Sequence, residues 1–244
     1  METTYIEIDS PDKHLSDVLE EIPSNVILYK TLTGIGATYS EIKAQRHSII
    51  IEPNVPVIIG KCNSDKHKND NLLGVYEGVT TDRIIKYLGA SRGKYYKILT
   101  TPESFTKVKD AFLIFNGKIY NTCFLLIDEA HKTIKDVDYR SDIVLPMNDF
   151  FKFKGKALVS ATPLKFSDPR FEENGFSIIK IEPTYDYAKE IDIKPSTNIL
   201  REVWEEFGWM PFITGQDKDR PFFIFINSVG IIYLSLIHIS EPTR

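Results

Sequence analysis

The sequence predicts an α/β fold in which helices cover both faces of a doubly wound, mainly parallel sheet. Over the first 200 residues, short apolar runs alternate with amphipathic helical segments, which is the pattern of repeated strand–helix units. Two of the runs, residues 26–29 and 124–127, lead into a glycine-rich turn and a pair of carboxylates. Strands that are apolar throughout are buried on both faces, and open parallel sheets bind ligands at the carboxyl ends of such strands. We therefore expect a site at one edge of the sheet.

The first expected element is an amphipathic helix over residues 10–22. Ser10 is a suitable N-cap, Pro11 fits the first helical position, and apolar residues recur at helical spacing until Pro23. Buried strands are then expected at residues 26–30, 48–54, 73–76, 95–99, 124–127, 156–159 and 176–181. Helices are expected to begin near Ala37, after Thr80 and within residues 100–105, and a later helix over 197–207 precedes a strand at 222–226.

The glycine-rich turn connects the first buried strand to the helix that follows. It consists of Thr33, Gly34, Ile35, Gly36, Ala37 and Thr38. Glycines allow the backbone to fold around phosphates with its N–H groups pointing inward, and the start of the helix adds a favourable field. We therefore expect these residues to bind the phosphates of a nucleotide.

The two carboxylates, Asp128 and Glu129, follow the strand at 124–127. Adjacent acids suit nucleotide hydrolysis, because Asp128 can hold a Mg²⁺ shell while Glu129 polarises a water for attack on a γ-phosphate. The alternative is a pair of solvated acids, which is common where a strand passes into a loop.

These two segments and a third, Ser160-Ala161-Thr162, occur in the order of motifs I, II and III of the DEAD/DEAH-box superfamily 2 helicases and translocases. The sequence resembles this family over roughly residues 24–232. The resemblance implies a RecA-like sheet of the P-loop NTPase type, with ATP and Mg²⁺ as cofactors. It also implies that His131, Ser160, Ala161 and Thr162 couple hydrolysis to movement of a nucleic-acid strand.

The turn departs from the family at Ala37, where motif I has a lysine whose ammonium reaches the β- and γ-phosphates. Thr38, whose hydroxyl is a ligand of Mg²⁺ if the resemblance holds, is retained, so nucleotide binding is still expected, whereas hydrolysis depends on another cation. Lys30 before the turn and Lys43 in the following helix are the two substitutes that the sequence offers. Their spacing does not choose between them.

Two further turns resemble nucleic-acid contacts of the same family. Pro53 and Asn54 occupy the place of motif Ia, and Thr101, Pro102 and Glu103 occupy that of motif Ib, where a helix start can receive a backbone phosphate. A proline-containing turn and a simple helix cap are the alternatives. The implied partner is DNA or RNA, as a single strand or a duplex junction, and the sequence does not choose between the two.

The composition is that of an ordinary globular protein, with 42% hydrophobic and 26% charged residues among 244. A net charge of −4 gives no overall electrostatic footprint for nucleic acid. Cys62 and Cys123 form no metal-ligand pattern, which indicates a reducing compartment. No apolar run approaches the roughly 18 residues needed to span a membrane. We expect a cytoplasmic protein without a membrane partner, and the oligomeric state stays open.

Four segments are expected along the chain: an N-terminal helical segment at 1–23, a RecA-like ATPase domain at 24–200, the helix, linker and first strand of a second RecA-like domain at 201–233, and residues 234–244. The last segment resembles a translated sequencing adapter; a real strand followed by a turn is the alternative. A single strand cannot hold a second-domain arginine against the reacting phosphate, so we expect no helicase activity from this chain by itself.

The main hypothesis is the motor domain of an ATP-dependent nucleic-acid helicase or translocase, which couples ATP hydrolysis to strand movement. A viral DNA-packaging ATPase is one alternative, because it shares an acid pair and a coupling Ser/Thr motif. A non-hydrolysing module that binds nucleic acid or a protein partner is the other, and Ala37 is the residue that indicates it.

Overall fold

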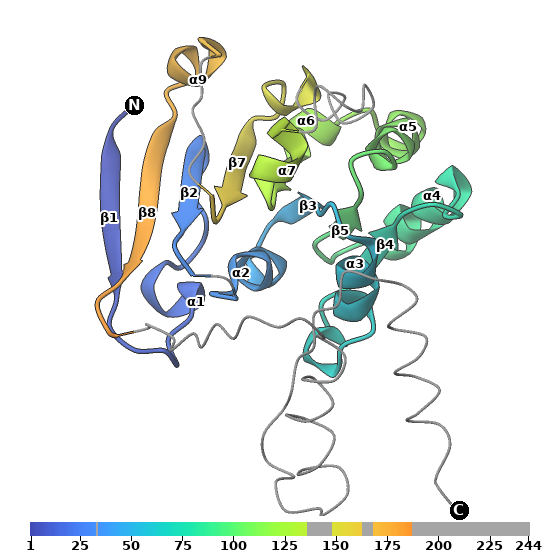
Figure 1. The fold of residues 1–244 in the computed structure, drawn as a ribbon. Coiled ribbons are helices and arrows are strands. Elements are labelled where there is room, and N and C mark those ends of the chain that lie inside the picture. Colours follow the sequence, from blue (N-terminus) through green and yellow to red (C-terminus); the bar gives the residue numbers. More distant parts are fainter. Residues whose placement is uncertain (33, 136–147, 163–167, 187–244) are drawn as a thin grey trace, which may run out of the picture. The chain divides into compact units, whose positions relative to one another are not determined.

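The computed structural model describes residues 1–32, 34–135, 148–162 and 168–186, which form an eight-stranded sheet covered by helices (Figure 1). The strand order is β1-β8-β2-β7-β6-β3-β5-β4, and every pair of neighbouring strands is parallel. The predicted α/β class with a doubly wound, mainly parallel sheet is therefore confirmed. Because all the strands run in one direction, the loops that follow them lie at one edge of the sheet.

The strands are β1 (Thr3–Ile8), β2 (Val26–Lys30), β3 (His47–Ile51), β4 (Leu72–Val75), β5 (Lys97–Thr100), β6 (Cys123–Ile127), β7 (Gly155–Ser160) and β8 (Ser177–Pro183). The helices are α1 (Leu15–Val18), α2 (Ala37–Lys43), α3 (Val55–Cys62), α4 (Thr81–Ala90), α5 (Phe105–Phe115), α6 (Ile119–Thr122), α7 (Ala130–Lys135) and α9 (Arg170–Glu173). A 3₁₀ turn, η1 (Asp65–His67), follows α3.

The central strands are apolar on both sides because hydrophobic clusters lie on both faces of the sheet. In β3, Ile49 and Ile51 belong to one cluster and Ile50 to the other. In β6, Leu125 and Leu126 are divided between the clusters in the same way. Successive side chains of a strand alternate between faces, so two apolar faces produce the continuous apolar runs in the sequence.

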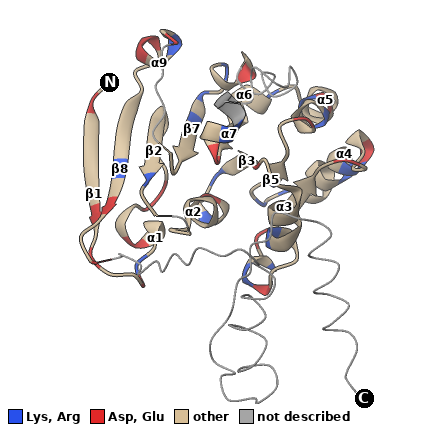
Figure 2. Ribbon diagram, viewed as in Figure 1, with Lys and Arg blue, Asp and Glu red and all other residues tan. Residues whose placement is uncertain are grey.

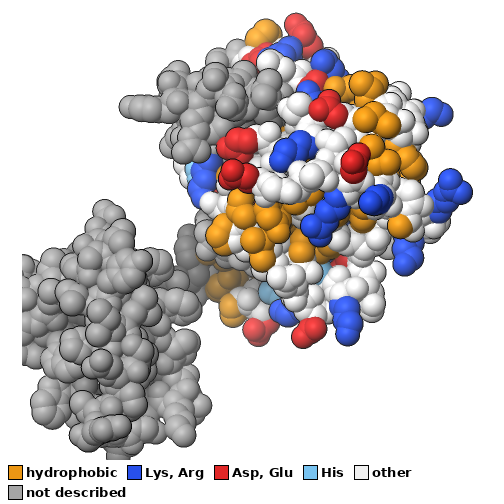
Figure 3. Space-filling model, turned by 90° about the vertical axis from the view of Figure 1, so that its right-hand side faces the viewer, with side chains coloured by type: hydrophobic (Ala, Val, Ile, Leu, Met, Phe, Trp, Pro, Cys, Tyr) orange, Lys and Arg blue, Asp and Glu red, His pale blue; other side chains and the backbone are white. Residues whose placement is uncertain are grey.

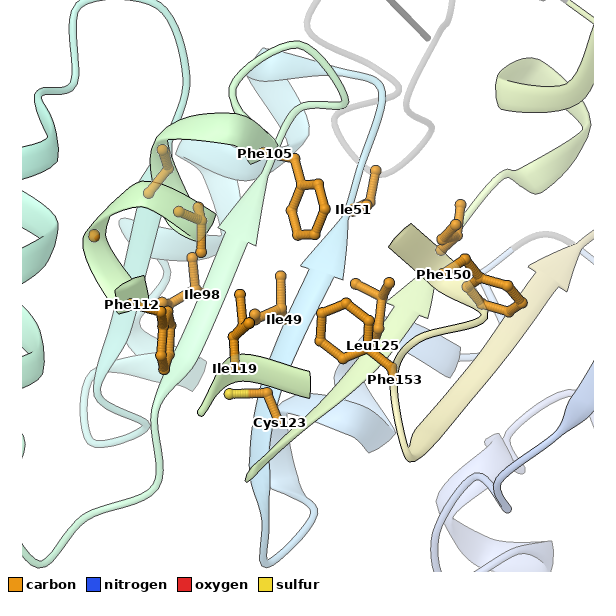
Figure 4. Packing of buried hydrophobic residues seen from close by; sticks show 14 of the residues in the cluster. Ile49, Ile51, Ile98, Phe105, Phe112, Ile119, Cys123, Leu125, Phe150 and Phe153 are labelled. Carbon is orange, nitrogen blue, oxygen red and sulfur yellow. The ribbon is translucent and has the colours of Figure 1, made fainter. Parts of the chain in front are cut away.

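The helices divide between the two faces. Buried residues of α4, α5, α6, α7 and α9 belong to the cluster that contains Ile49, and those of α1, α2 and α3 belong to the opposite one. Figure 4 shows the first cluster, in which the rings of Phe105 and Phe153 lie near the strands that carry Ile49 and Leu125, and the ring of Phe112 lies beside Ile98. Because helices cover both faces, the loops that carry the motifs lie at the carboxyl ends of the strands.

The helix expected over residues 10–22 is shorter in the structure. α1 covers Leu15–Val18 alone, and the side chain of Asp17 accepts a hydrogen bond from the backbone N–H of His14 at 2.7 Å, which starts the helix at that point. Pro11 therefore lies before the helix. Leu15 and Ile22 are fully buried, and the N–H of Leu15 donates to Ile35 O at 2.8 Å. Packing against the glycine-rich turn thus replaces the longer helix that the apolar spacing predicts.

Residues 3–8 also differ from the expected helical segment at 1–23, because they form the edge strand β1. This strand pairs with β8, with Thr3 opposite Ile178 and Ile8 opposite Pro183. Most of β1 is exposed and Ile8 is its buried residue, so the period-two pattern is weak. Its stabilisation comes from pairing with a strand far along the chain, which local sequence patterns do not reveal.

The other predicted strands agree closely with the structure. The strand at 26–30 is β2, whereas the one predicted at 95–99 begins two residues later, as β5. Tyr96 lies outside the strand because its ring stacks on His47, with 4.3 Å between ring centroids. Its backbone N–H also donates to the His47 ring at 2.9 Å, a side-chain acceptor, and not to a backbone carbonyl of β3.

The chain divides into two compact units, Met1–Ala188 and Lys189–Arg244. The expected helix at 197–207, the strand at 222–226 and the adapter-like residues 234–244 lie outside the described residues. Among the helices that the structure describes, none is long and apolar enough to cross a bilayer.

Charged residues of both signs are spread over the helices and loops of the first unit, while most of the strand ribbon carries neither (Figure 2). On the face shown in Figure 3, basic, acidic and apolar side chains are interspersed among the described residues. This distribution agrees with the net charge of −4 and gives that face no single-sign surface. A few charged residues are nevertheless buried, among them Lys30 at the carboxyl end of β2, Glu41 and Lys97.

Candidate functional site

A pocket of about 1080 Å³ opens where the carboxyl ends of β2, β3 and β6 meet the start of α2. It lies at the sheet edge that the sequence predicts, and it is large enough for a small organic ligand. Its walls include residues of the glycine-rich turn and both predicted acids, namely Gly34, Ile35, Gly36, Ala37, Thr38, Asp128 and Glu129. The structure thus brings the two main motifs together.

The glycine-rich turn has the backbone conformation that requires glycine. Gly34 and Gly36 have φ angles of +82° and +88°, in the left-handed region that other residues adopt at a cost. α2 begins at Ala37 directly after the second of these glycines, and Ala37 and Thr38 are both buried. Thr33, the first residue predicted to bind phosphate, lies outside the described residues.

Asp128 joins the turn to the end of β6. One carboxylate oxygen accepts a hydrogen bond from the Thr38 hydroxyl at 2.5 Å, and the other accepts from the backbone N–H of Glu129 at 2.8 Å. The carboxylate is almost completely buried, with 4% of the residue exposed. A hydroxyl and a carboxylate oxygen are therefore in direct contact at the place where the sequence predicts Mg²⁺.

Lys30 supplies the counter-charge for both acids. Its ammonium lies 2.9 Å from Asp128 Oδ1 and 2.8 Å from Glu129 Oε1, and 7% of the residue is exposed. Burial by itself lowers the pKa of Lys30, but the attraction of Asp128 and the hydrogen bond to Glu129 outweigh it, so the pKa is raised above its ordinary value. The ammonium is therefore held charged inside the pocket.

Glu129 has an unusual backbone, with a φ angle of +49°. A residue with a side chain adopts this left-handed conformation only at an energetic cost, and such strain is concentrated at functional sites. The hydrogen bond from its N–H to Asp128 helps to hold the conformation. The result is a sharp turn directly after β6 that directs the Glu129 carboxylate to the pocket wall.

His131 connects the acids to the end of β7. Its Nδ1 atom lies 3.2 Å from the Ser160 hydroxyl and 3.4 Å from a carboxylate oxygen of Glu129. The Ser160 hydroxyl donates to Thr162 O at 2.7 Å and accepts from the Thr162 N–H at 3.1 Å. Because that hydroxyl has already used its hydrogen, Nδ1 of His131 must carry the proton and donate. Ala161, between the two hydroxyl residues, is half-buried.

Glu52, directly after β3, is a third acid on the pocket wall, and like Asp128 it is buried. Burial, followed by repulsion from Asp128, raises the pKa of this carboxyl above its ordinary value. One of its oxygens accepts weak hydrogen bonds from the backbone and side chain of Asn54, both at 3.3 Å. Glu52 thus links the acid cluster to the turn predicted to contact nucleic acid.

The two predicted nucleic-acid turns differ in their relation to the pocket. Asn54 is the N-cap of α3 and lines the pocket, and Pro53 is half-buried beside it. Thr101 and Pro102 are buried, and the Thr101 hydroxyl accepts from the Ser104 N–H at 3.3 Å to form a turn before α5. Glu103 is the exposed residue of that turn, which is not part of the pocket wall.

The structure distinguishes between the two lysines that the sequence offered as substitutes for the missing lysine of the glycine-rich turn. Lys43 lies at the end of α2, where Asp70 holds its ammonium at 2.7 Å, and it does not line the pocket. Lys30 reaches both acids. The sequence contained one feature that favours Lys30 over Lys43. Lys30 is the last residue of an otherwise apolar strand, and a charge buried there needs a partner of opposite charge.

The residues present fit a Mg²⁺ ion, although the described residues contain no cluster of three or more His, Cys, Asp or Glu side chains that could hold a metal. Mg²⁺ takes oxygen ligands, keeps several waters and is often bound by one or two protein oxygens together with substrate phosphates. The Thr38 hydroxyl and the Asp128 carboxylate provide such oxygens.

No family model matches the chain, and no curated protein matches it. Several solved structures are similar. A hypothetical ATP-dependent RNA helicase from Sulfolobus tokodaii is 16% identical with a TM-score of 0.45, over 64% of this chain and 48% of that one. The Hef helicase domain of Pyrococcus furiosus is 14% identical with a TM-score of 0.45, over 70% of this chain and 38% of that one.

A DEAD box protein from Methanococcus jannaschii is 19% identical with a TM-score of 0.42, over 64% of this chain and 45% of that one. The chain thus spans about half, or less, of the length of these structures. Similarity at this level carries no argument about function, which has to come from the side chains of the site.

Proposed function

We propose that the chain is the nucleotide-binding motor domain of an ATP-dependent nucleic-acid helicase or translocase. The observation that carries the proposal is the contact between Thr38 and Asp128, with Glu129 next to it, in a pocket walled by a glycine-rich turn. This set combines a phosphate cradle, oxygen ligands for Mg²⁺ and an acid for a water molecule, which are the parts that phosphoryl transfer to water requires.

Each residue of this set has a distinct task in hydrolysis. Thr38 and Asp128 would hold Mg²⁺, which neutralises charge on the phosphates when bound. Glu129 accepts a proton from the attacking water, whose oxygen forms a bond to the γ-phosphorus while the bond to the β–γ bridging oxygen breaks. The products are ADP and inorganic phosphate. The Glu129 side chain is 22% exposed, so a water molecule has access to it.

Coupling to a partner would run from Glu129 through His131 to Ser160 and Thr162. The short contacts from the Glu129 carboxylate to His131 and on to Ser160 give a continuous polar connection between the acids and the end of β7. A rearrangement at Glu129 would therefore change the hydrogen bonding of the loop that begins at Ser160.

DNA or RNA is the partner that fits such a motor, and Asn54 is the predicted contact nearest to the nucleotide, because it lines the same pocket. The first unit has no single-sign face in the view of Figure 3. We therefore expect nucleic-acid binding that depends on bound nucleotide more than on overall charge.

Ala37 supports a second candidate, a non-hydrolysing module that binds nucleic acid or a protein partner. The glycine-rich turn has no cationic side chain among its described residues, Gly34 to Thr38. If no other cation took the place of the lysine missing at Ala37, a triphosphate would bind weakly and would not be hydrolysed.

The test measures binding of a fluorescent ATP analogue to the whole chain, with and without Mg²⁺. We expect Mg²⁺-dependent binding that weakens at least about tenfold in Asp128→Asn, because a charge-assisted contact is lost. The matched control is Asp168→Asn, an acid paired with Arg170 outside the pocket, which should change binding less than about twofold.

Phosphate release then separates the two candidates. Slow ATP turnover that is abolished in Glu129→Gln supports the motor. Binding without any turnover, in the presence or absence of DNA and RNA, supports the non-hydrolysing module. Absence of binding at millimolar nucleotide would refute the motor and would also favour the non-hydrolysing module.

A further inference from the structure

The pocket contains a cation that its phosphate-binding turn lacks. Four lysines line the pocket: Lys30, Lys61, Lys66 and Lys132. Lys66 and Lys132 are exposed and Lys61 is half-buried. Water solvates an exposed ammonium well, so it has little reason to settle on one ligand. Lys30 differs because it is buried, ion-paired and fixed at the end of a central strand.

The position of Lys30 depends on rigid elements. β2 lies between β7 and β8 in the sheet. Its last residue, Lys30, pairs with Ile181 of β8, and Tyr29 before it pairs with both neighbouring strands. The Lys30 ammonium and the Thr38 hydroxyl contact opposite oxygens of the same Asp128 carboxylate. The cation is thus one hydrogen-bonded group away from the turn that begins α2.

The charges at this point do not balance. Two carboxylates, those of Asp128 and Glu129, share the single ammonium of Lys30, and a third acid, Glu52, lies on the same pocket wall. A bare polyphosphate approaching this group would be repelled, and a divalent cation would be attracted. When a divalent cation neutralises Asp128, the ammonium becomes available to another anion.

We propose that Lys30 takes the place of the lysine missing at Ala37: its ammonium leaves the acids to contact the phosphates of a bound nucleoside triphosphate. The inference rests on the proposed function, since it assigns a residue to the same site. Without nucleotide, Lys30 serves as the counter-ion that allows Asp128 to be buried next to Glu129. The same charge therefore has two positions, and the ligand selects between them.

The test moves the cation from one position to the other. Lys30→Met removes the ammonium, and Lys30→Met combined with Ala37→Lys restores one on the turn itself. Ala37 lines the pocket, so the new side chain starts on its wall. Lys43→Met is the control, because Lys43 is also ion-paired and belongs to α2 but does not line the pocket.

Binding of the fluorescent ATP analogue with Mg²⁺ is measured for each variant, and melting curves report folding. We expect Lys30→Met to bind at least about tenfold more weakly than the wild type, since it loses contacts between opposite charges. The double variant should recover to within about threefold of the wild type, and Lys43→Met should stay within about twofold. AMP, which lacks the outer phosphates, should bind the Lys30→Met and wild-type chains alike.

Removing one partner of a buried ion pair is strongly destabilising, so a second background is included in the test. If Lys30→Met does not melt cooperatively, Lys30→Met with Glu129→Gln is compared with Glu129→Gln alone, because this background has one acid fewer to leave unpaired. We expect the same loss of affinity of about tenfold or more.

Two results would overturn the inference and leave the proposed function intact: wild-type affinity in Lys30→Met, or a folded double variant that binds as weakly as Lys30→Met. The second result would mean that Lys30 acts by holding the acids in place and not by contacting phosphate. A wild-type chain that binds no nucleotide would overturn the proposed function itself, and the inference with it.

Discussion

Replacing Glu41 by glutamine should destabilise the chain although Glu41 lies outside the pocket. Glu41 belongs to α2 and is fully buried. Its carboxylate accepts hydrogen bonds from Arg46, at 3.0 and 2.5 Å, and from the Ser48 hydroxyl at 2.6 Å. The guanidinium of Arg46 also donates to Ile22 O and lies 3.5 Å above the ring of Phe124. These contacts tie the helix that follows the glycine-rich turn to the neighbouring strand.

The magnitude follows from the three hydrogen bonds. Glutamine has nearly the same size, but its amide is uncharged and presents N–H groups where the carboxylate accepted. Loss of charge assistance costs about 1 kcal/mol per retained bond, and a buried donor left unpaired costs about 1–3 kcal/mol. The Arg46 side chain is 20% exposed, so water compensates part of this. We expect a loss of about 3 kcal/mol in total, or about 6–12 °C in melting temperature for a unit of this size.

The assay is urea unfolding at neutral pH, compared between the wild type, Glu41→Gln and Asp168→Asn. The Asp168 and Arg170 side chains are 33% and 43% exposed, so breaking that pair should cost less than about 1 kcal/mol. A Glu41→Gln variant within about 1 kcal/mol of the wild type would show that the network does not stabilise the fold.

Two further predictions concern pH and backbone strain. Burial lowers the pKa of Lys97 from 10.5 to about 8, so between these pH values the unfolded chain binds more protons than the folded chain and stability rises with pH. The free energy of unfolding of the wild type should therefore increase between about pH 7.5 and 9.5 relative to that of Lys97→Met. Parallel pH profiles of the two chains would contradict this. At Glu129, where φ is +49°, glycine should be more stable than alanine by about 1 kcal/mol in thermal melts, and an equal or more stable Glu129→Ala variant would exclude strain at this residue.

The sheet was predictable because burial on both faces leaves a strong local signal. The apolar runs of β2, β3 and β6 and the turn residues after them needed no long-range information, and the structure places both predicted acids and most of the phosphate-binding turn at one pocket. Parallel strands alone impose this, since their carboxyl ends share an edge. The chemical roles of these residues stay predictions.

The features that sequence reasoning missed depend on distant partners. β1 is mostly exposed and is stabilised by β8, and Lys30 became distinct from Lys43 only when its distance to Asp128 was known. Lys97 gave no signal either, although its ammonium donates at 2.8 Å to Glu41 O and Ala44 O at the end of α2. A buried charge is specified by what surrounds it in space, which spacing along the chain does not encode.

The position of β8 between β1 and β2 has a consequence for how the chain folds. β1 is among the first segments made, but its neighbour in the sheet, β8, is made last among the described strands. Until β8 inserts, β1 has no partner and one edge of β2 is unpaired. Closing such a distant contact is entropically slow, and an open strand edge favours association with other chains. We therefore expect ribosome-bound chains that end before residue 177 to be the aggregation-prone stage of synthesis, and the insertion of β8 to complete the domain.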